Sequence, residues 1–274
     1  MNPQLFHKFS ELVNTLTGIH LAPGKESMVS ARIQRRMRVL NISSASDYYE
    51  YVVNPEHKDE IIHLIDAIST NVTYFYREHI HFDFLTGYVK ECVEAGQTQF
   101  KVWCAAASSG EEPYTIAMTI QEAAFPNRFE WKMLATDIST RVLATAKQAK
   151  YSEEKLSKVP DRYRHKYFHR VQQTHEQDAA GKIYVVSDEL RTPIRFARLN
   201  LTDTPYPMRG PFDCVFCRNV MIYFENELRA RLLQEVYRLL RPGGILILGS
   251  AESLVGLTSD LQAVKPSIYR KPLR

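Results

Sequence analysis

The sequence constrains the fold most strongly through an alternation of short apolar runs and longer amphipathic segments that begins at residue 101. The apolar runs have the length of β-strands, and the amphipathic segments carry apolar residues at helical spacing. In chain order, the predicted elements are strand 101–104, helix 111–124, strand 131–136, helix 139–150, strands 194–199 and 212–217, helix 225–240 and strand 245–248. Strands that alternate with helices favour a mostly parallel sheet covered on both faces. This region is therefore predicted to be a doubly wound α/β domain.

Residues 5–68 show a different pattern, in which apolar residues recur at helical spacing and no strand pattern interrupts them. Gly18 is expected to end a first helix, and Pro23-Gly24 separates it from a second. The chain is thus predicted to contain an all-helical domain over residues 1–70 and the α/β domain over residues 71–274. Between about residues 151 and 193 the alternation lapses into a charged segment containing Tyr and His. This lapse indicates an inserted subdomain with a helix and a small antiparallel hairpin.

Composition excludes several other classes of protein. The 274 residues are 45% hydrophobic, and no run approaches the roughly eighteen apolar residues that a membrane span needs. The amino terminus lacks a signal pattern, so we expect a cytoplasmic protein without direct membrane insertion. The net charge of +4 does not by itself indicate nucleic-acid binding. The cysteines are expected to be reduced, and Cys214-x-x-Cys217 has no second Cys/His pair to complete a zinc site, so no metal is predicted.

A turn of small residues, Ala105-Ala-Ala-Ser-Ser-Gly110, joins the first strand to the next helix, where doubly wound folds bind nucleotide-like ligands. Small side chains let the backbone approach a ligand, and the free N–H groups of the helix start meet its polar atoms. Only Gly110 is glycine, so the turn is a poor pyrophosphate site. Glu111 and Glu112 would repel a pyrophosphate and suit the cationic amino group of a methionine moiety. Alternatively, both residues simply complement the helix dipole.

Asp137 directly follows the second predicted strand, and a carboxylate at this carboxyl end lies within reach of a ribose diol. As a cap of the following helix it would look the same, and only the upstream turn favours the ligand role. The turn Arg241-Pro-Gly-Gly244 resembles the entry to a late strand of the class I methyltransferase fold. Ser267-Ile-Tyr-Arg270 then corresponds to the final, antiparallel strand of that fold. This likeness makes a dehydrogenase the weakest alternative.

Four ordered motifs extend the resemblance over nearly the whole chain. They are Thr70-Asn-Val-Thr-Tyr-Phe-Tyr-Arg-Glu78, Trp103-Cys-Ala-Ala-Ala-Ser-Ser-Gly-Glu-Glu-Pro-Tyr114, Ala135-Thr-Asp-Ile-Ser139 and Gly210-Pro-Phe-Asp-Cys-Val-Phe-Cys-Arg-Asn-Val-Met-Ile-Tyr-Phe224. Together with the preceding helical region and the insertion, they closely resemble the chemotaxis receptor glutamate O-methyltransferases, the CheR family. The resemblance implies a class I, Rossmann-like methyltransferase domain with an amino-terminal helical domain and a small inserted β-subdomain.

The resemblance also implies a cofactor, S-adenosylmethionine, with S-adenosylhomocysteine as product. The residues that would bind it are Asn71, Thr73, Arg77, Glu111 or Glu112, Asp137, Asn200, Leu201, Arg218 and Asn219. Arg77 is also expected to hold the attacking carboxylate, and Tyr223 to face the transferring methyl group. Four of these residues also fit structural roles, with Asn71 and Thr73 as turn and cap residues, Arg77 in a surface ion pair and Tyr223 as a packed aromatic residue.

Arg32, Arg35 and Arg36 lie at positions i, i+3 and i+4 of a predicted helix, with Arg38 nearby. Such a run is usually a solvated face, but the resemblance implies receptor helices that carry acidic residues, and the run also suits docking of that partner. The chemoreceptor cytoplasmic domain is therefore the expected partner of a monomeric enzyme. Some members of the resembled family tether to a receptor's carboxyl-terminal pentapeptide through a short glycine-rich loop. The corresponding residues 171–181 are longer and have glycine only at the end, so we expect pentapeptide-independent binding.

Two alternatives from other functional classes remain open at this point. One is a class I methyltransferase that acts on a small molecule or on nucleic acid. The other is a non-catalytic scaffold that binds S-adenosylmethionine, although the retention of Arg77, Asn219 and Tyr223 argues against it.

Overall fold

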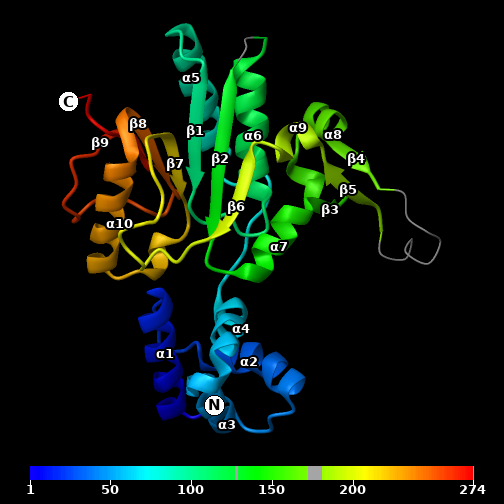
Figure 1. The fold of residues 1–274 in the computed structure, drawn as a ribbon, viewed down its shortest axis with the longest axis vertical. Helices are drawn as coiled ribbons and strands as arrows, with labels where there is room; N and C mark the ends of the chain where they lie inside the picture. The colour runs from blue at the N-terminus through cyan, green and yellow to red at the C-terminus, as the bar shows by residue number, and fades with distance from the viewer. Residues whose placement is uncertain (127–128, 172–180, 274) are drawn as a thin grey trace.

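A computed structural model describes residues 1–126, 129–171 and 181–273. The chain forms a helical part and an α/β part (Figure 1). The helical part contains α1 (Pro3–Thr17), α2 (Glu26–Leu40), α3 (Ala45–Val53), the short η1 (Pro55–His57) and α4 (Lys58–Ile68). Their apolar faces meet in one core around Phe9, Ile33 and Leu64. Gly18 caps α1 with a left-handed φ of 70°, as the sequence predicts.

A seven-stranded sheet has the order β6-β2-β1-β7-β8-β10-β9. The strands are β1 (Gln99–Cys104), β2 (Glu130–Asp137), β6 (Ile194–Arg198), β7 (Phe212–Cys217), β8 (Leu240–Leu248), β9 (Gln262–Lys265) and β10 (Ile268–Arg270). In this order, the neighbouring strands β6, β2, β1, β7 and β8 are parallel, and β10 is antiparallel to β8. After β1 the chain passes to β2 on one side of β1, and it later returns to pair with the other side of β1 as β7. The carboxyl ends of β1 and β7 therefore form a topological switch point, where open α/β sheets bind ligands.

Helices cover both faces of this sheet. One face packs on α5 (Ile80–Glu94) and α6 (Glu111–Ala124), and the other on α10 (Asn226–Leu239). α7 (Thr140–Gln148) lies beside β2 and β6. The predicted doubly wound α/β fold is thus confirmed. Figure 1 shows the helical part beneath the arrowheads of β1, β2 and β6, which places it over the ligand-binding edge of the sheet.

The predicted insertion lies between α7 and β6. It contains β3 (Lys150–Ser152), η2 (Lys155–Lys158), α8 (Asp161–Tyr167), β4 (Phe168–Arg170), β5 (Ile183–Val186) and α9 (Asp188–Arg191). The expected helix and hairpin are present, and β3 adds a third antiparallel strand to give the order β3-β5-β4. Residues 172–180 lie outside the described residues. The expectation of pentapeptide-independent binding depends on this loop, so it falls outside the described part of the chain.

Cys214 and Cys217 both lie in β7, with buried and unpaired thiols. Burial raises the pKa of each thiol well above its ordinary value. Among the described residues, no helix combines the length and apolar character needed to cross a membrane.

Candidate active site

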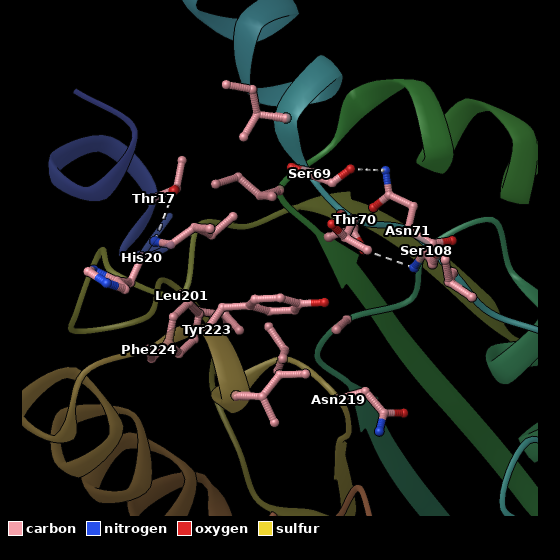
Figure 2. Close-up of a pocket in the computed structure, with 18 of the residues that line it drawn as sticks. Thr17, His20, Ser69, Thr70, Asn71, Ser108, Leu201, Asn219, Tyr223 and Phe224 are labelled. Carbon is pink, nitrogen blue, oxygen red and sulfur yellow. Dashed lines mark hydrogen bonds between the residues drawn. The ribbon is translucent and has the colours of Figure 1, made fainter. Parts of the chain in front are cut away.

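A cavity of about 680 Å³ lies between the helical part and the carboxyl ends of the parallel strands. Its walls come from the end of α1, from α2, from the segment that joins α4 to α5, and from the loops after β1, β2, β6 and β7. Figure 2 shows this convergence: Thr17 and Asn71 approach from the helical side, Leu201 and Asn219 from the sheet side. The volume is that of a pocket for a nucleoside-sized ligand.

The turn after β1 depends on Gly110. Its φ of 99° belongs to the left-handed region, and a Cβ there would lie 2.5 Å from the Tyr151 hydroxyl and 3.1 Å from the Cα of Ala146. The small residues Ala105, Ala106 and Ser108 line the cavity. This turn therefore places backbone against the ligand space, as the sequence predicts.

The two glutamates at the start of α6 point in different directions. Glu111 is buried outside the cavity, where it accepts hydrogen bonds from Lys155 Nζ and Ser109 Oγ, each at 2.6 Å. Glu112 lines the cavity. Of the pair that the sequence left unresolved, the geometry favours Glu112 as the residue facing a ligand.

Arg218 links Glu112 to the joining segment. The guanidinium donates to Glu112 Oε2 at 2.6 Å, to Glu78 Oε2 at 3.0 Å and to the Arg77 carbonyl at 2.7 Å. Burial acts to lower the pKa of Arg218, but the carboxylates of Glu112 and Glu78 outweigh it and raise that pKa. The cluster is a buried chain of alternating charges beside the cavity, with its hydrogen bonds charge-assisted.

Asp137 stands at the end of β2 and lines the cavity. Its carboxylate accepts from the Ser108 N–H at 2.8 Å and from the Ser139 N–H at 2.9 Å. The helix cap itself is Ser139, whose side chain accepts from the Val142 N–H. Asp137 therefore fastens the β1 turn to the end of β2 and still faces the ligand space.

The joining segment contributes Asn71, Thr73 and Arg77 to the cavity wall. Arg77 Nη1 donates to the Val72 carbonyl at 2.9 Å, and its Nε lies 3.9 Å from Glu78 Oε1. The Asn71 carbonyl accepts from Ser108 Oγ at 3.0 Å. The first two contacts lie within the segment, and the bond from Ser108 attaches the segment to the β1 turn.

Residues after β6 and β7 complete the cavity. Asn200 donates to the Leu16 carbonyl at 2.8 Å, and Leu201 beside it is buried. Asn219 follows Arg218, and Tyr223 ends the short helix η4 (Met221–Tyr223). In Figure 2 the Tyr223 ring extends across the cavity toward the side where Thr70 and Ser108 lie. The structure thus brings Tyr223 into the same space as the predicted cofactor residues.

The four arginines of α2 do not share one environment. Arg36 is paired with Glu60, with a shortest distance of 2.6 Å, and Arg32 lines the cavity while donating to the Ile68 carbonyl. Arg35 and Arg38 are exposed. The exposed positive surface is therefore narrower than the helical spacing predicts, because two of the guanidinium groups serve internal contacts.

Sequence reasoning assigned no role to Glu78, Glu252 or the cavity-lining residues His20 and Lys25. Glu78 is the last residue of the motif Thr70–Glu78, and this is the only sequence feature that indicates a functional role for it. Glu252 lies beyond the last parallel strand, and no local pattern there marks a site. Their roles become visible only when distant segments meet.

Glu78 is expected to give the protein a pH-dependent stability. Burial acts to raise the pKa of Glu78, but bonds from Arg218, Ser250 and Asn219 lower it from 4.5 to about 2. A carboxyl whose pKa is lowered by folding stabilises the protein above its unfolded pKa, and that stabilisation is lost as the pH falls through the folded pKa. Glu78→Gln should lower the free energy of unfolding at pH 7 by about 2–3 kcal/mol, and this difference should shrink between pH 4.5 and 2. Denaturant titrations of both proteins across this range measure it; a constant difference would contradict the assignment.

The fold and the cavity together define a class of protein. The site lies at the switch point of a doubly wound sheet, its turn lacks the dinucleotide glycines, a carboxylate ends β2, and the last pairing of the sheet is antiparallel. Cavity-facing Glu112 and Asp137 suit a cationic nucleoside, and Ile138, Leu199 and Leu201 supply apolar walls. These features are those of a class I methyltransferase, and the residues present fit S-adenosylmethionine.

Comparison with known families makes the assignment specific. Residues 71–270 match the family model described as the CheR methyltransferase SAM binding domain, and residues 4–69 match the CheR methyltransferase all-alpha domain. The chain belongs to the CheR methyltransferase family. It is a methyltransferase that uses S-adenosylmethionine, which confirms the expected family, enzyme class and cofactor.

Relatives cover almost the whole chain. Chemotaxis protein methyltransferase 2 of Pseudomonas aeruginosa is 35% identical, over 96% of this chain and 91% of that protein. The chemotaxis protein methyltransferase of Escherichia coli K12 is 37% identical, over 96% and 89%. That of Borreliella burgdorferi is 34% identical, over 93% and 89%.

Proposed function

We propose that the chain methylates glutamate side chains on the cytoplasmic helices of chemoreceptors, forming glutamyl methyl esters in chemotaxis adaptation. The strongest support for this proposal is that Arg77 and Tyr223 line the same cavity as the β1 turn and Asp137. The Arg77 guanidinium, which can bind a carboxylate, and the Tyr223 hydroxyl would thus stand beside the proposed methyl-donor site. The names of the relatives, chemotaxis protein methyltransferases, support the same substrate class.

The cofactor set that we propose comprises Asn71, Thr73, Arg77, Glu112, Asp137, Asn200, Leu201, Arg218 and Asn219, all of which line the cavity. Glu111 is left out because its carboxylate is bonded to Lys155 and Ser109. Asp137 would hold the ribose hydroxyls, and Glu112 would face the amino group of the methionine moiety. The boundary near residue 70 then separates the helical part from the part that binds the cofactor, with the insertion at about 151–193.

Bound S-adenosylmethionine supplies an electrophilic methyl group on a sulfonium. The acceptor glutamate is ionised near neutral pH, so its oxygen forms the new bond without a general base. Transfer of this methyl group to the glutamate oxygen would leave the electron pair of the former carbon–sulfur bond on the sulfur, so the chain would have no proton to move. The chain's contribution is then mostly positioning, which can supply several kcal/mol of the barrier. Arg77 would hold the carboxylate by hydrogen bonds, and the Tyr223 hydroxyl would lie against the transferring group.

The receptor surface that we propose begins at Arg35 and Arg38, whose exposed guanidinium groups suit acidic receptor helices. Arg32 would contribute to substrate binding from the cavity wall, and Arg36 would contribute indirectly, through its ion pair with Glu60. The enzyme would then dock as a monomer, and docking would not require the receptor's carboxyl-terminal pentapeptide.

Incubation with methyl-labelled S-adenosylmethionine and receptor cytoplasmic fragments tests the proposed function. Fragments with and without the pentapeptide should acquire equal amounts of base-labile methyl ester, mapped to glutamates. Label on nucleic acid or a small molecule alone would overturn the substrate class. Dependence on the pentapeptide would overturn only the mode of docking.

Arg77→Ala and Tyr223→Phe are expected to lower turnover more than cofactor affinity. Each removes a group that acts where the carboxylate meets the methyl, so kcat should fall by about 10–100-fold, as for a misplaced reacting group. Calorimetry with S-adenosylhomocysteine should show a smaller loss of affinity. Tyr74→Phe is a matched control, because Tyr74 is exposed and does not line the cavity. Wild-type turnover in both site variants would remove the proposed catalytic assignment.

A further inference from the structure

The loop after β7 contains an uncommon backbone conformation. Asn219 has a φ of 57°, in the left-handed region, and η4 follows directly. This loop presents Asn219 and Tyr223 to the cavity. Asparagine tolerates this conformation better than most residues, but the path of the loop still depends on contacts with the surrounding structure.

Glu252, from the loop after β8, supplies such contacts. Its carboxylate accepts hydrogen bonds from the N–H groups of Asn219 at 2.7 Å, Val220 at 3.0 Å and Ile222 at 3.2 Å. A fourth bond comes from the Gly249 N–H at 2.7 Å. Glu252 is only 5% exposed, so its carboxylate is held inside the protein, and without it these N–H donors would lose their partner.

Glu252 is itself fixed in place. Its N–H donates to the Gly249 carbonyl at 2.8 Å, and its own carbonyl accepts from Ser267 Oγ at 3.2 Å. The two loops approach so closely that a Cβ on Gly249 would lie 2.4 Å from Asn219 Nδ2 and 2.8 Å from Glu252 Oε2. These contacts fix Glu252 against the loop that carries Tyr223.

We propose that Glu252 is a positioning residue for methyl transfer, which sets the place of Asn219 and Tyr223 by holding the backbone between them. Glu252 does not line the cavity, so it acts only through this backbone. The proposal rests on the proposed function for the role of Tyr223, while the backbone bonds stand independently of it.

Glu252→Gln keeps the shape of the side chain but turns an N–H₂ group toward backbone donors, so at least one bond must break. We expect kcat to fall by about tenfold or more, as for a displaced reacting group, with a smaller change in the affinity for S-adenosylhomocysteine. In a Tyr223→Phe background, Glu252→Gln should have little further effect on kcat, because both changes disable the same group, the Tyr223 hydroxyl. A purely structural role would instead give multiplicative losses. Glu227→Gln, an exposed residue of α10, is the matched control.

Amide hydrogen exchange tests the support directly and without turnover. In the wild type, the amides of Asn219, Val220 and Ile222 should be protected, and Glu252→Gln should speed their exchange while α6 stays unchanged. Unprotected wild-type amides, exchange unaltered by the substitution, or multiplicative kinetic losses would each overturn the proposal. If receptor fragments are not methylated at all, the proposed function fails while the exchange experiment still decides whether Glu252 holds the loop.

Discussion

Arg218→Met is expected to lower the free energy of unfolding by about 3–5 kcal/mol, the usual effect of removing one partner from a buried ion pair. Arg218 is only 3% exposed, and its guanidinium joins Glu112, Glu78 and the Arg77 carbonyl. Methionine fills much of the volume but leaves both carboxylates without their shared cation. Denaturant unfolding at pH 7 measures the loss, and the affinity for S-adenosylhomocysteine should fall with it because Arg218 lines the cavity.

A matched control separates this effect from the loss of any arginine. Arg238 pairs with Glu235 at 2.7 Å, but its side chain is 47% exposed, so Arg238→Met should cost less than about 1 kcal/mol. Adding Glu112→Gln to Arg218→Met should recover part of the stability, since it removes one uncompensated buried charge. Equal losses in the two arginine variants would show that the charged chain does not stabilise the site.

Local sequence patterns predict the fold well because the buried strands and amphipathic helices have strong periodicity. β7 and the carboxyl half of β8 are buried at every position, as expected for strands covered on both faces. β9 was missed because it has only four residues, of which just Ala263 and Val264 are apolar, and none of the four is buried. β3 was missed because it is only three residues long.

The β1 turn, Asp137 and Tyr223 could be predicted as neighbours from the sequence because each lies at or after the end of a predictable strand, and all of them line one cavity. Sequence reasoning did not predict how charges pair across the chain. Arg36 pairs with Glu60 on another helix, and Arg218 reaches Glu78 across 140 positions of sequence. Spacing within one helix shows which residues share a face, but not which partners the next helix brings to them.

Asp137→Ala is the second change with a large expected effect, here on cofactor binding. The carboxylate holds the N–H groups of Ser108 and Ser139, and in the proposed function it also holds the ribose hydroxyls. Bonds to a charged group contribute about 1.5–3 kcal/mol each, so losing the ribose contacts and loosening the β1 turn should weaken S-adenosylhomocysteine binding by about 100-fold or more. Calorimetry measures this loss.

Asp137→Asn separates the two contributions to that loss. One amide oxygen would still accept a backbone bond, but the N–H₂ group would face the second N–H donor, so the affinity should lie between those of the wild type and Asp137→Ala. Asp188→Ala is the control, because Asp188 is 88% exposed on α9 and bonds only Arg191 through its side chain among the described residues. Wild-type affinity in Asp137→Ala would exclude Asp137 as the ribose ligand, and it would then serve only to join the ends of β1 and β2.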